Sequence, residues 1–312
     1  IEIGGQRSAR MRGARARVEA ARARLAWRRI EVAASVRESF GRALATQRLL
    51  EVARENEANA RQAMDAAVQR FEAGDISRLE SNAARVGRAR ALQEHNRAQQ
   101  DAANALAELQ LLMALPQQEG LALQGQLNPT SPPAEQLPSS VAVESRADVR
   151  AARFELEAAQ ADNELAGREW LPSPNVGASF AHEEGAEIVQ GVFGVDLPVL
   201  NRNQAGRGAA AARVTQAQEA LDACRRRAQQ ELRLASLRLR LAEQAVSAFA
   251  TDVVDAMREN LDLGNQAYEA GQIDFMQLLL MRRESSDARR DHVQALTELD
   301  AAHVELQRVN GK

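Results

Sequence analysis

Two short segments that lie far apart in the chain resemble each other and constrain the fold more than any other feature. Residues 71–77 read FEAGDIS and residues 268–274 read YEAGQID, an offset of 268 − 71 = 197 residues. In each copy a glycine is followed by Ser or Asp, a pattern typical of one helix ending and the next beginning. Helical stretches flank both copies. The sequence therefore predicts two copies of a helix–turn–helix unit that make up most of the chain.

The stretch from Val214 to Ala256 has the apolar spacing of a coiled coil. Small or apolar residues recur along it at alternating steps of three and four, with one extra step of four that relaxes the supercoil. A second apolar row, which includes Leu234, Leu237 and Leu241, lies on a neighbouring face. Because a two-stranded coiled coil needs only one such row, two rows predict neighbouring helices on both sides, as in a sheet or barrel of helices.

These patterns predict the limits of the helices. We expect very long helices over about 8–68 and 204–263, and shorter returning helices over about 77–114 and 274–309. Residues 1–115 then form the first repeat, residues 116–145 a linker rich in Pro, Gly, Gln and Ser, and residues 146–312 the second repeat, which opens with a helix over about 146–169. The opening Ile1-Glu2-Ile3 reads like a strand, so we expect a fragment or processed chain whose pairing strand precedes residue 1.

The amino-acid composition fits long helices better than a compact enzyme core. Hydrophobic residues make up 45% of the 312 residues, but aromatic residues make up only 3%. Alanine lets helices approach closely and fills little volume, whereas Phe, Tyr and Trp usually supply the volume of a globular core. The formal net charge is −3, so the chain lacks the basic footprint of a nucleic-acid-binding protein. We expect neither an enzyme nor a nucleic-acid partner.

The sequence also predicts one β-hairpin. Residues 175–182 and 188–197 have strand character, with a turn around Gly185 between them. The apolar side chains of the second strand share one face: Val189, Phe193, Val195 and Leu197. Strands of about 9–11 residues with apolar-out alternation suit a membrane β-barrel, but a soluble hairpin explains the pattern equally well. A single hairpin cannot close a barrel, so strands from other subunits would be needed.

Residues that could carry chemistry are sparse and scattered. Cys224 is the single cysteine, so the chain has no internal disulfide or cysteine metal site. His292 and His303 share a helix face but would lie about 16 Å apart, too far to bind one metal ion. Neither a phosphate-binding glycine loop nor a Ser/His/Asp set is evident. We expect no catalytic residues, no cofactor and no metal site.

The order of these elements resembles the TolC family of outer-membrane efflux proteins. The residues that carry the resemblance are YEAG at 268–271 with its first-copy counterpart, LLMALP at 111–116, SRADV at 145–149, WLP at 170–172 and VDLPVLNRNQ at 195–204. Residues 2–7, EIGGQR, together with residues 197–204, further resemble the CzcC-type members. Those members serve heavy-metal efflux pumps of the resistance–nodulation–division class.

The resemblance implies a mainly α fold with a small membrane β part. In a homotrimer, each subunit would give four strands to one twelve-stranded β-barrel in the outer membrane of a Gram-negative bacterium, and the helices would form an α-barrel in the periplasm. The expected function is a passive conduit, with heavy-metal cations as substrates. Its expected partners are outer-membrane lipid, a periplasmic adaptor (membrane fusion) protein and an inner-membrane resistance–nodulation–division pump. A soluble coiled-coil scaffold without channel function is the alternative.

The resemblance also implies roles for the two helical tips. The adaptor would dock at Ala73, Gly74 and Asp75, and at Ala270, Gly271 and Gln272. The family gates its tunnel with acidic side chains beyond the second tip glycine, but the positions six and nine residues after that glycine hold Gln277 and Leu280. The candidate gate residues are therefore Asp75, Glu80, Asp274 and Gln277, with an ordinary solvated helix face as the other interpretation of each.

Overall fold

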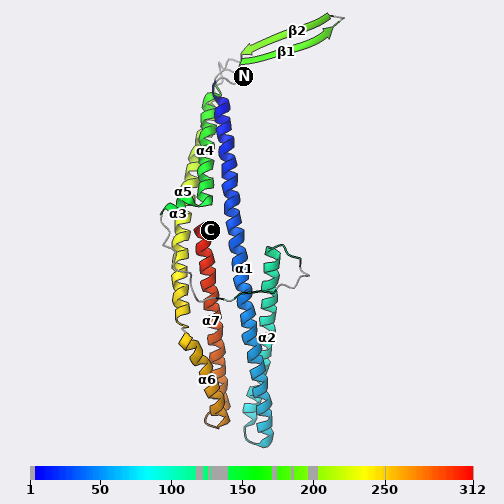
Figure 1. Ribbon diagram of the computed structural model, residues 1–312, viewed down its shortest axis with the longest axis vertical. Helices are drawn as coiled ribbons and strands as arrows, with labels where there is room; N and C mark the ends of the chain where they lie inside the picture. Colours follow the sequence, from blue (N-terminus) through cyan, green and yellow to red (C-terminus); the bar gives the residue numbers. More distant parts are fainter. Residues whose placement is uncertain are drawn as a thin grey trace. The chain divides into compact units, whose positions relative to one another are not determined.

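The computed structural model describes residues 4–116, 122–125, 127, 140–170, 174–183, 186–195, 203–249 and 251–311. The elements follow one another in the order α1 Gln6–Ala73, α2 Arg78–Leu112, α3 Ser140–Ser145, α4 Ala147–Arg168, β1 Pro174–Glu183, β2 Ala186–Val195, α5 Gln204–Ser247, α6 Thr251–Glu269 and α7 Phe275–Val309 (Figure 1). The mainly helical prediction is confirmed. The 68 residues of α1 give a helix about 100 Å long.

Contacts divide the described residues into two compact units. The hairpin unit contains α1 up to Ile30, α3, α4, both strands, α5 up to Leu232, and Val309. The tip unit contains the rest of α1, α2, the end of α5, α6 and α7 up to Arg308. The division into a first repeat, a linker and a second repeat follows the sequence copies rather than these units, and stays a prediction.

In the hairpin unit, α4 packs between α1 and α5. Apolar residues of α4 meet α5 in a cluster that contains Val149, Leu156, Leu221 and Ala228. On its other side α4 forms three ion pairs with α1, which join Arg12 to Glu164, Arg17 to Asp162, and Arg24 to Glu155. The contact face of α1 in this unit consists of buried alanines: Ala9, Ala16, Ala20 and Ala23. Small side chains allow the close helix approach that the composition suggests.

In the tip unit, α1 packs against α2 and α7, α2 also contacts α7, and α7 packs against α5 and α6. Ala43 of α1 meets Leu109 of α2 in one buried cluster. Between α1 and α7, Asn56 Nδ2 donates to Ser286 Oγ at 2.5 Å. On the other side of α7, Leu299 packs with Leu239 of α5 in a further cluster. The first apolar row of α5 is buried against α7, whereas the second row is exposed among the described residues, at Leu234, Leu237 and Leu241, so a neighbouring helix on that side stays a prediction.

The second long helix is interrupted, which corrects the prediction of one helix over 204–263. α5 ends at Ser247 and α6 begins at Thr251. The amide of Phe249 donates to the Val246 carbonyl three residues back, at 2.9 Å, which tightens the last turn. The Phe249 ring stacks on His292 of α7 with ring centroids 5.4 Å apart. Since neither Gly nor Pro lies near this break, the local sequence gives no signal for it.

The predicted hairpin is present, with strands that reach closer to the turn than expected. β1 and β2 pair antiparallel, and the register places Val176 opposite Phe193 and Phe180 opposite Val189. Leu197, the turn around Gly185, the opening residues 1–3 and most of the predicted linker lie outside the described residues.

No helix among the described residues combines the length and the apolar character that a membrane span requires.

Candidate functional site

The first tip turn joins α1 to α2 through Gly74. Gly74 has φ +82°, a left-handed conformation that glycine adopts without strain. The Asp75 amide donates to the Arg70 carbonyl at 2.8 Å, which closes the end of α1. Ser77 then caps α2: the Glu80 amide donates to Ser77 Oγ at 3.2 Å, and the Ser77 amide donates to Glu80 Oε2 at 2.8 Å. This reciprocal pair is a capping box.

The second tip turn joins α6 to α7 and repeats this geometry. Gly271 has φ +73°, and the Gln272 amide donates to the Ala267 carbonyl at 2.8 Å. Asp274 takes the place of the capping serine. The Gln277 amide donates to Asp274 Oδ1 at 2.7 Å, and the Asp274 amide donates to Gln277 Oε1 at 3.1 Å. The two sequence copies therefore build the same turn with different side chains.

These contacts give most of the candidate gate residues a structural task. Glu80, Asp274 and Gln277 hold the two capping boxes, whereas Asp75 is exposed and its side chain takes no part in the caps. The six predicted docking residues are all exposed at the turns: Ala73, Gly74, Asp75, Ala270, Gly271 and Gln272. They offer a surface to a partner, and both the docking role and the gate role stay predictions.

Beneath the turns lies an apolar cluster that links both copies. Ala67, Ala84 and Phe275 are buried in it, and Ile76 and Tyr268 pack against it. The Phe275 side chain is only 1% exposed, and its ring centroid lies 5.8 Å from that of Tyr268. The motif YEAG contains Tyr268, but its sequence pattern indicates only a helix end. The contact between the pair α1 and α2 and the pair α6 and α7 depends on tertiary packing, which a local sequence pattern does not reveal.

A tip glycine replaced by alanine should destabilise the turn through backbone strain alone. An added Cβ at Gly74 or Gly271 meets no atom within 4 Å, so the cost comes from the left-handed backbone. We expect Gly74→Ala or Gly271→Ala to lower the free energy of unfolding by about 1 kcal/mol, measured by urea unfolding in detergent. Gly87→Ala is the matched control, because it lies within α2 and its Cβ would contact Leu279 at an ordinary 3.8 Å. That control should stabilise by about 0.5–1 kcal/mol; equal losses would contradict this explanation.

The hairpin presents one apolar face that the described residues leave uncovered. The register brings Val176, Phe180, Val189 and Phe193 to the same face, and each is at least 66% exposed. Of the residues named for this face from sequence, Val195 also lies on it and is 42% exposed. The first strand's contribution was missed because its apolar residues are fewer. Two exposed pairs of large apolar side chains on one narrow ribbon mark an interaction surface.

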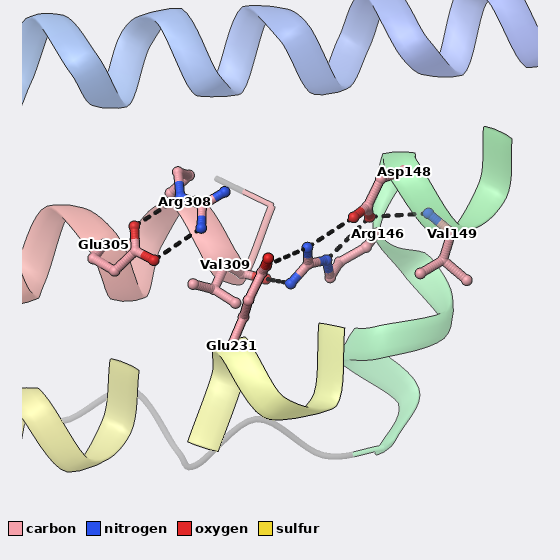
Figure 2. Close-up of polar contacts among 7 residues, drawn as sticks. All are labelled: Arg146, Asp148, Val149, Glu231, Glu305, Arg308 and Val309. Atoms are coloured by element: carbon pink, nitrogen blue, oxygen red, sulfur yellow. Dashed lines mark hydrogen bonds and ion pairs between the residues drawn. The ribbon is translucent and has the colours of Figure 1, made fainter. Parts of the chain in front are cut away.

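A buried arginine organises the hairpin unit and was not predicted from sequence. Arg146 lies at the start of α4, and its side chain is 2% exposed. Its guanidinium donates to both carboxylate oxygens of Asp148 at 3.0 and 2.8 Å, and to Glu231 of α5 at 2.8 Å (Figure 2). It also donates to the carbonyl of Val309 at 3.5 Å and lies 4.7 Å from the ring centroid of Trp27. One side chain thus joins α1, α4, α5 and the end of α7.

Arg146 stays charged because the interactions with its acidic partners outweigh the cost of burying its charge. Burial disfavours the charged guanidinium, but the hydrogen bonds and charges of Asp148 and Glu231 raise the pKa of Arg146 above its ordinary value. The resemblance had singled out residues 145–149 only as a motif. Its arginine and aspartate form this ion pair, a role that requires Glu231 and Val309 from distant parts of the chain.

Asp300 in the tip unit should make stability depend on pH. Its carboxylate faces Gly41 of α1, and burial raises the pKa of Asp300 while His303 partly opposes the shift. The folded state therefore holds this proton more tightly than the unfolded state, and stability falls as the pH rises from the unfolded value of 3.8 through the raised pKa.

We expect Asp300→Asn to remove this fall and to exceed the parent in stability at neutral pH. The measurement is urea unfolding over a pH series, with Asp291→Asn, an exposed carboxyl of α7, as the control. Parallel pH curves for the parent and Asp300→Asn would contradict the assignment.

In the part of the chain that the structure describes, no group of three or more His, Cys, Asp or Glu side chains is arranged so that it could hold a metal ion.

Comparisons with known proteins show what the chain is similar to. The family model described as "Outer membrane efflux protein" matches residues 1–115 and 139–312. The cobalt-zinc-cadmium resistance protein CzcC of Cupriavidus metallidurans is 28% identical over 316 residues, which cover 100% of this chain and 75% of that protein.

Solved structures agree with the fold. The CmeC outer membrane channel of Campylobacter jejuni superimposes with a TM-score of 0.88 at 15% identity, over 100% of this chain and 69% of that chain. A membrane protein from Pseudomonas aeruginosa gives a TM-score of 0.84 at 22% identity, over 99% of this chain and 72% of that chain. Because the family model matches both halves of the sequence, the chain belongs to the family of outer membrane efflux proteins.

Proposed function

We propose that this protein is the channel subunit of a tripartite efflux system of the resistance–nodulation–division class, and that it exports heavy-metal cations as a passive homotrimeric conduit. Strands β1 and β2 would join those of other subunits in a barrel in the outer membrane. The helices would extend into the periplasm, where the tip turns would meet an adaptor protein and, through it, the inner-membrane pump. Family membership and the likeness to the cobalt-zinc-cadmium resistance protein support this proposal.

The observation that carries the proposal is the uncovered apolar face of the hairpin. A two-stranded ribbon is marginal in water by itself, and this one exposes Val176, Phe180, Val189 and Phe193 together. Lipid on that face, with neighbouring strands along both edges, would satisfy both its apolar side chains and its backbone. The opposite face is mixed: it carries the polar Asn175, Ser179 and Gln190 together with the apolar Ala181, Ile188 and Val192.

Metal export by this route requires no metal-binding cluster in the channel itself. A conduit that passes ions in water leaves the choice of substrate to the pump. The low aromatic content also fits a conduit, because helices around a tunnel pack against neighbouring helices and do not fill a compact core. The family found is one of efflux proteins rather than of enzymes.

Oligomeric state and membrane insertion test this proposal. The protein produced in a bacterial outer membrane and extracted in detergent should have the mass of a trimer by light scattering. A stable, soluble monomer that does not associate with membranes would contradict the proposal. Deletion of residues 175–197 separates the two functions considered: a coiled-coil scaffold would stay assembled and soluble without the hairpin, whereas a channel would lose insertion.

A further inference from the structure

The tip unit contains a cavity of about 1610 Å³ among α1, α2, α6 and α7, which we name the tip cavity. In the described part of the chain, seven arginines line this cavity against three carboxylates. Ion pairs with carboxylates neutralise three of the arginines: Arg283, Arg289 and Arg290. The other four form no ion pair with the described residues: Arg70, Arg90, Arg97 and Arg282. The tip cavity therefore carries an excess of positive charge.

Arg282 of α7 is the arginine of this set that most needs a counter-ion. Its half-buried guanidinium donates to Asn265 Oδ1 of α6 at 2.7 Å and to the Asn59 carbonyl of α1 at 3.4 Å. Both of these acceptors are neutral. Burial lowers the pKa of Arg282 from its ordinary value, and Tyr268 opposes this shift only in part. Carboxylates raise the pKa of Arg146 despite its burial, whereas the cost of burying the charge of Arg282 is not compensated.

Two hydroxyl groups of the cavity lining are buried without a hydrogen-bond partner among the described residues. They are Ser285 Oγ of α7 and Tyr268 Oη of α6, and Ser285 as a whole is 8% exposed. A hydroxyl within a helix often donates to the carbonyl four residues back, as Thr297 of the same helix does to Val293 at 2.7 Å. Since a buried donor without an acceptor is costly, these hydroxyls would be stabilised by a polar ligand.

The sequence spacing gathers these groups around Arg282. Ser285 lies three residues after Arg282 on α7, so the two side chains are neighbours on one helix face. Tyr268 lies three residues after Asn265 on α6, and Asn265 Oδ1 accepts from Arg282. That hydrogen bond orients the Asn265 amide, whose Nδ2 group remains a donor. One part of the tip cavity thus combines a guanidinium, an amide and two hydroxyls.

An anion satisfies this combination of groups better than water or a metal ion. Water would accept from the hydroxyls but would leave the guanidinium charge without a counter-ion, and a metal cation would be repelled by that charge. Carboxylate and phosphate oxygens accept from guanidinium, amide and hydroxyl donors together. Arg90 and Arg97, which are exposed on α2 and line the same cavity, would attract such an anion toward Arg282.

We propose that the tip cavity binds a small oxyanion at Arg282, with Ser285 Oγ and Asn265 Nδ2 as further donors. The ligand is an ion or molecule that carries a phosphate or carboxylate group. Because Arg282 already joins α7 to α1 and α6, the bound oxyanion would strengthen the contact among these three helices. The site goes beyond the proposed function and does not depend on it.

Titration of the full chain in detergent tests the site and identifies the source of the oxyanion. Sodium phosphate and sodium succinate are compared with sodium chloride at equal ionic strength, by calorimetry and by the urea midpoint of unfolding. We expect at least one of the two oxyanions to bind with saturation at one site per chain and to raise the urea midpoint above its value in chloride. Tighter binding of phosphate indicates an inorganic source, whereas tighter binding of succinate indicates an organic acid.

Arg282→Gln should weaken this binding by about tenfold to a hundredfold, because it removes a charge-assisted hydrogen bond to the oxyanion. The matched control is Arg85→Gln, which also removes one positive charge. Arg85 is exposed on α2 and does not line the tip cavity, so the oxyanion affinity of this control should match that of the parent.

Ser285→Ala is a second test that keeps the charge of the site, and it decides the question if Arg282→Gln fails to fold. In chloride its urea midpoint should equal or exceed that of the parent, because the change removes a buried hydroxyl without a partner among the described residues. The oxyanion should then raise the midpoint of this variant less than it raises that of the parent. A serine that only packs in the core would not give these different results in the two salts.

The outcomes separate this site from the proposed function. Saturable binding that weakens in Arg282→Gln and Ser285→Ala, but not in Arg85→Gln, supports the site. Equal urea midpoints in phosphate, succinate and chloride, or equal oxyanion affinities for the parent and both site variants, would overturn the site and leave the channel proposal standing. A soluble monomer that still bound the oxyanion at Arg282 would contradict the channel proposal and leave the site standing.

Discussion

Arg146→Met should lower the free energy of unfolding of the hairpin unit by about 3–5 kcal/mol, the cost typical of removing one partner from a buried ion pair. The side chain is 2% exposed, and its removal leaves Asp148 and Glu231 without their shared cation, at 19% and 28% exposure. The carbonyl of Val309 loses its donor as well. Methionine keeps much of the apolar contact with Trp27, so the measured loss should report the charge.

Urea unfolding of the detergent-solubilised protein, followed by circular dichroism at the helix band, measures this loss. Arg153→Met is the matched control. Arg153 pairs with Glu144, but both side chains are more than 40% exposed, so screening by water should hold its loss to about 0–1 kcal/mol. Equal urea midpoints for Arg146→Met and Arg153→Met would contradict the role assigned to Arg146 in holding the helices of the hairpin unit together.

Phe193→Arg should prevent stable insertion of the protein in the outer membrane. Phe193 lies on the apolar face of the hairpin, opposite Val176, and is 73% exposed. An arginine facing lipid near the middle of a bilayer costs about 2–4 kcal/mol, and three copies in a trimer would repeat that cost. The measurement is the fraction of protein that resists alkaline extraction from outer membranes.

Gln190→Arg is the control for this second variant, because Gln190 lies on the opposite face of the same strand. Its side chain would point to a lumen, where a charge is hydrated, so insertion should be close to that of the parent. If both variants inserted normally, the apolar face would not contact lipid. If both failed, the change would reflect loss of the hairpin itself rather than the face that carries the charge.

The elements that could be predicted from sequence depend on contacts between near neighbours in the chain. A glycine with a left-handed backbone and a cap three residues further on are local features, so both tip turns were recognised from FEAGDIS and YEAGQID. Strand alternation in β2 is equally local. The ends of α2 and α7 were predicted to within about two residues, the usual uncertainty at frayed helix ends.

Features that were missed depend on partners distant in sequence. The break after Ser247 coincides with the stacking of Phe249 on His292, and no local residue type announces it. Arg146 looked like one arginine among many, because the 40 basic residues are almost all arginines and only the fold brings Glu231 beside it. Glu80 and Gln277 are the exception, because each lies only three residues after the residue that caps its helix; they were considered as pore-lining residues although this spacing is that of a capping box.

Growth of a strain that lacks this protein, in the presence of zinc, cobalt or cadmium, tests the account most directly. The account predicts that deletion lowers the tolerated concentration of these cations, and that the parent chain restores it while the Phe193→Arg variant does not. A deletion strain that is sensitive only to dyes and detergents, with unchanged metal tolerance, would contradict metal export by this channel.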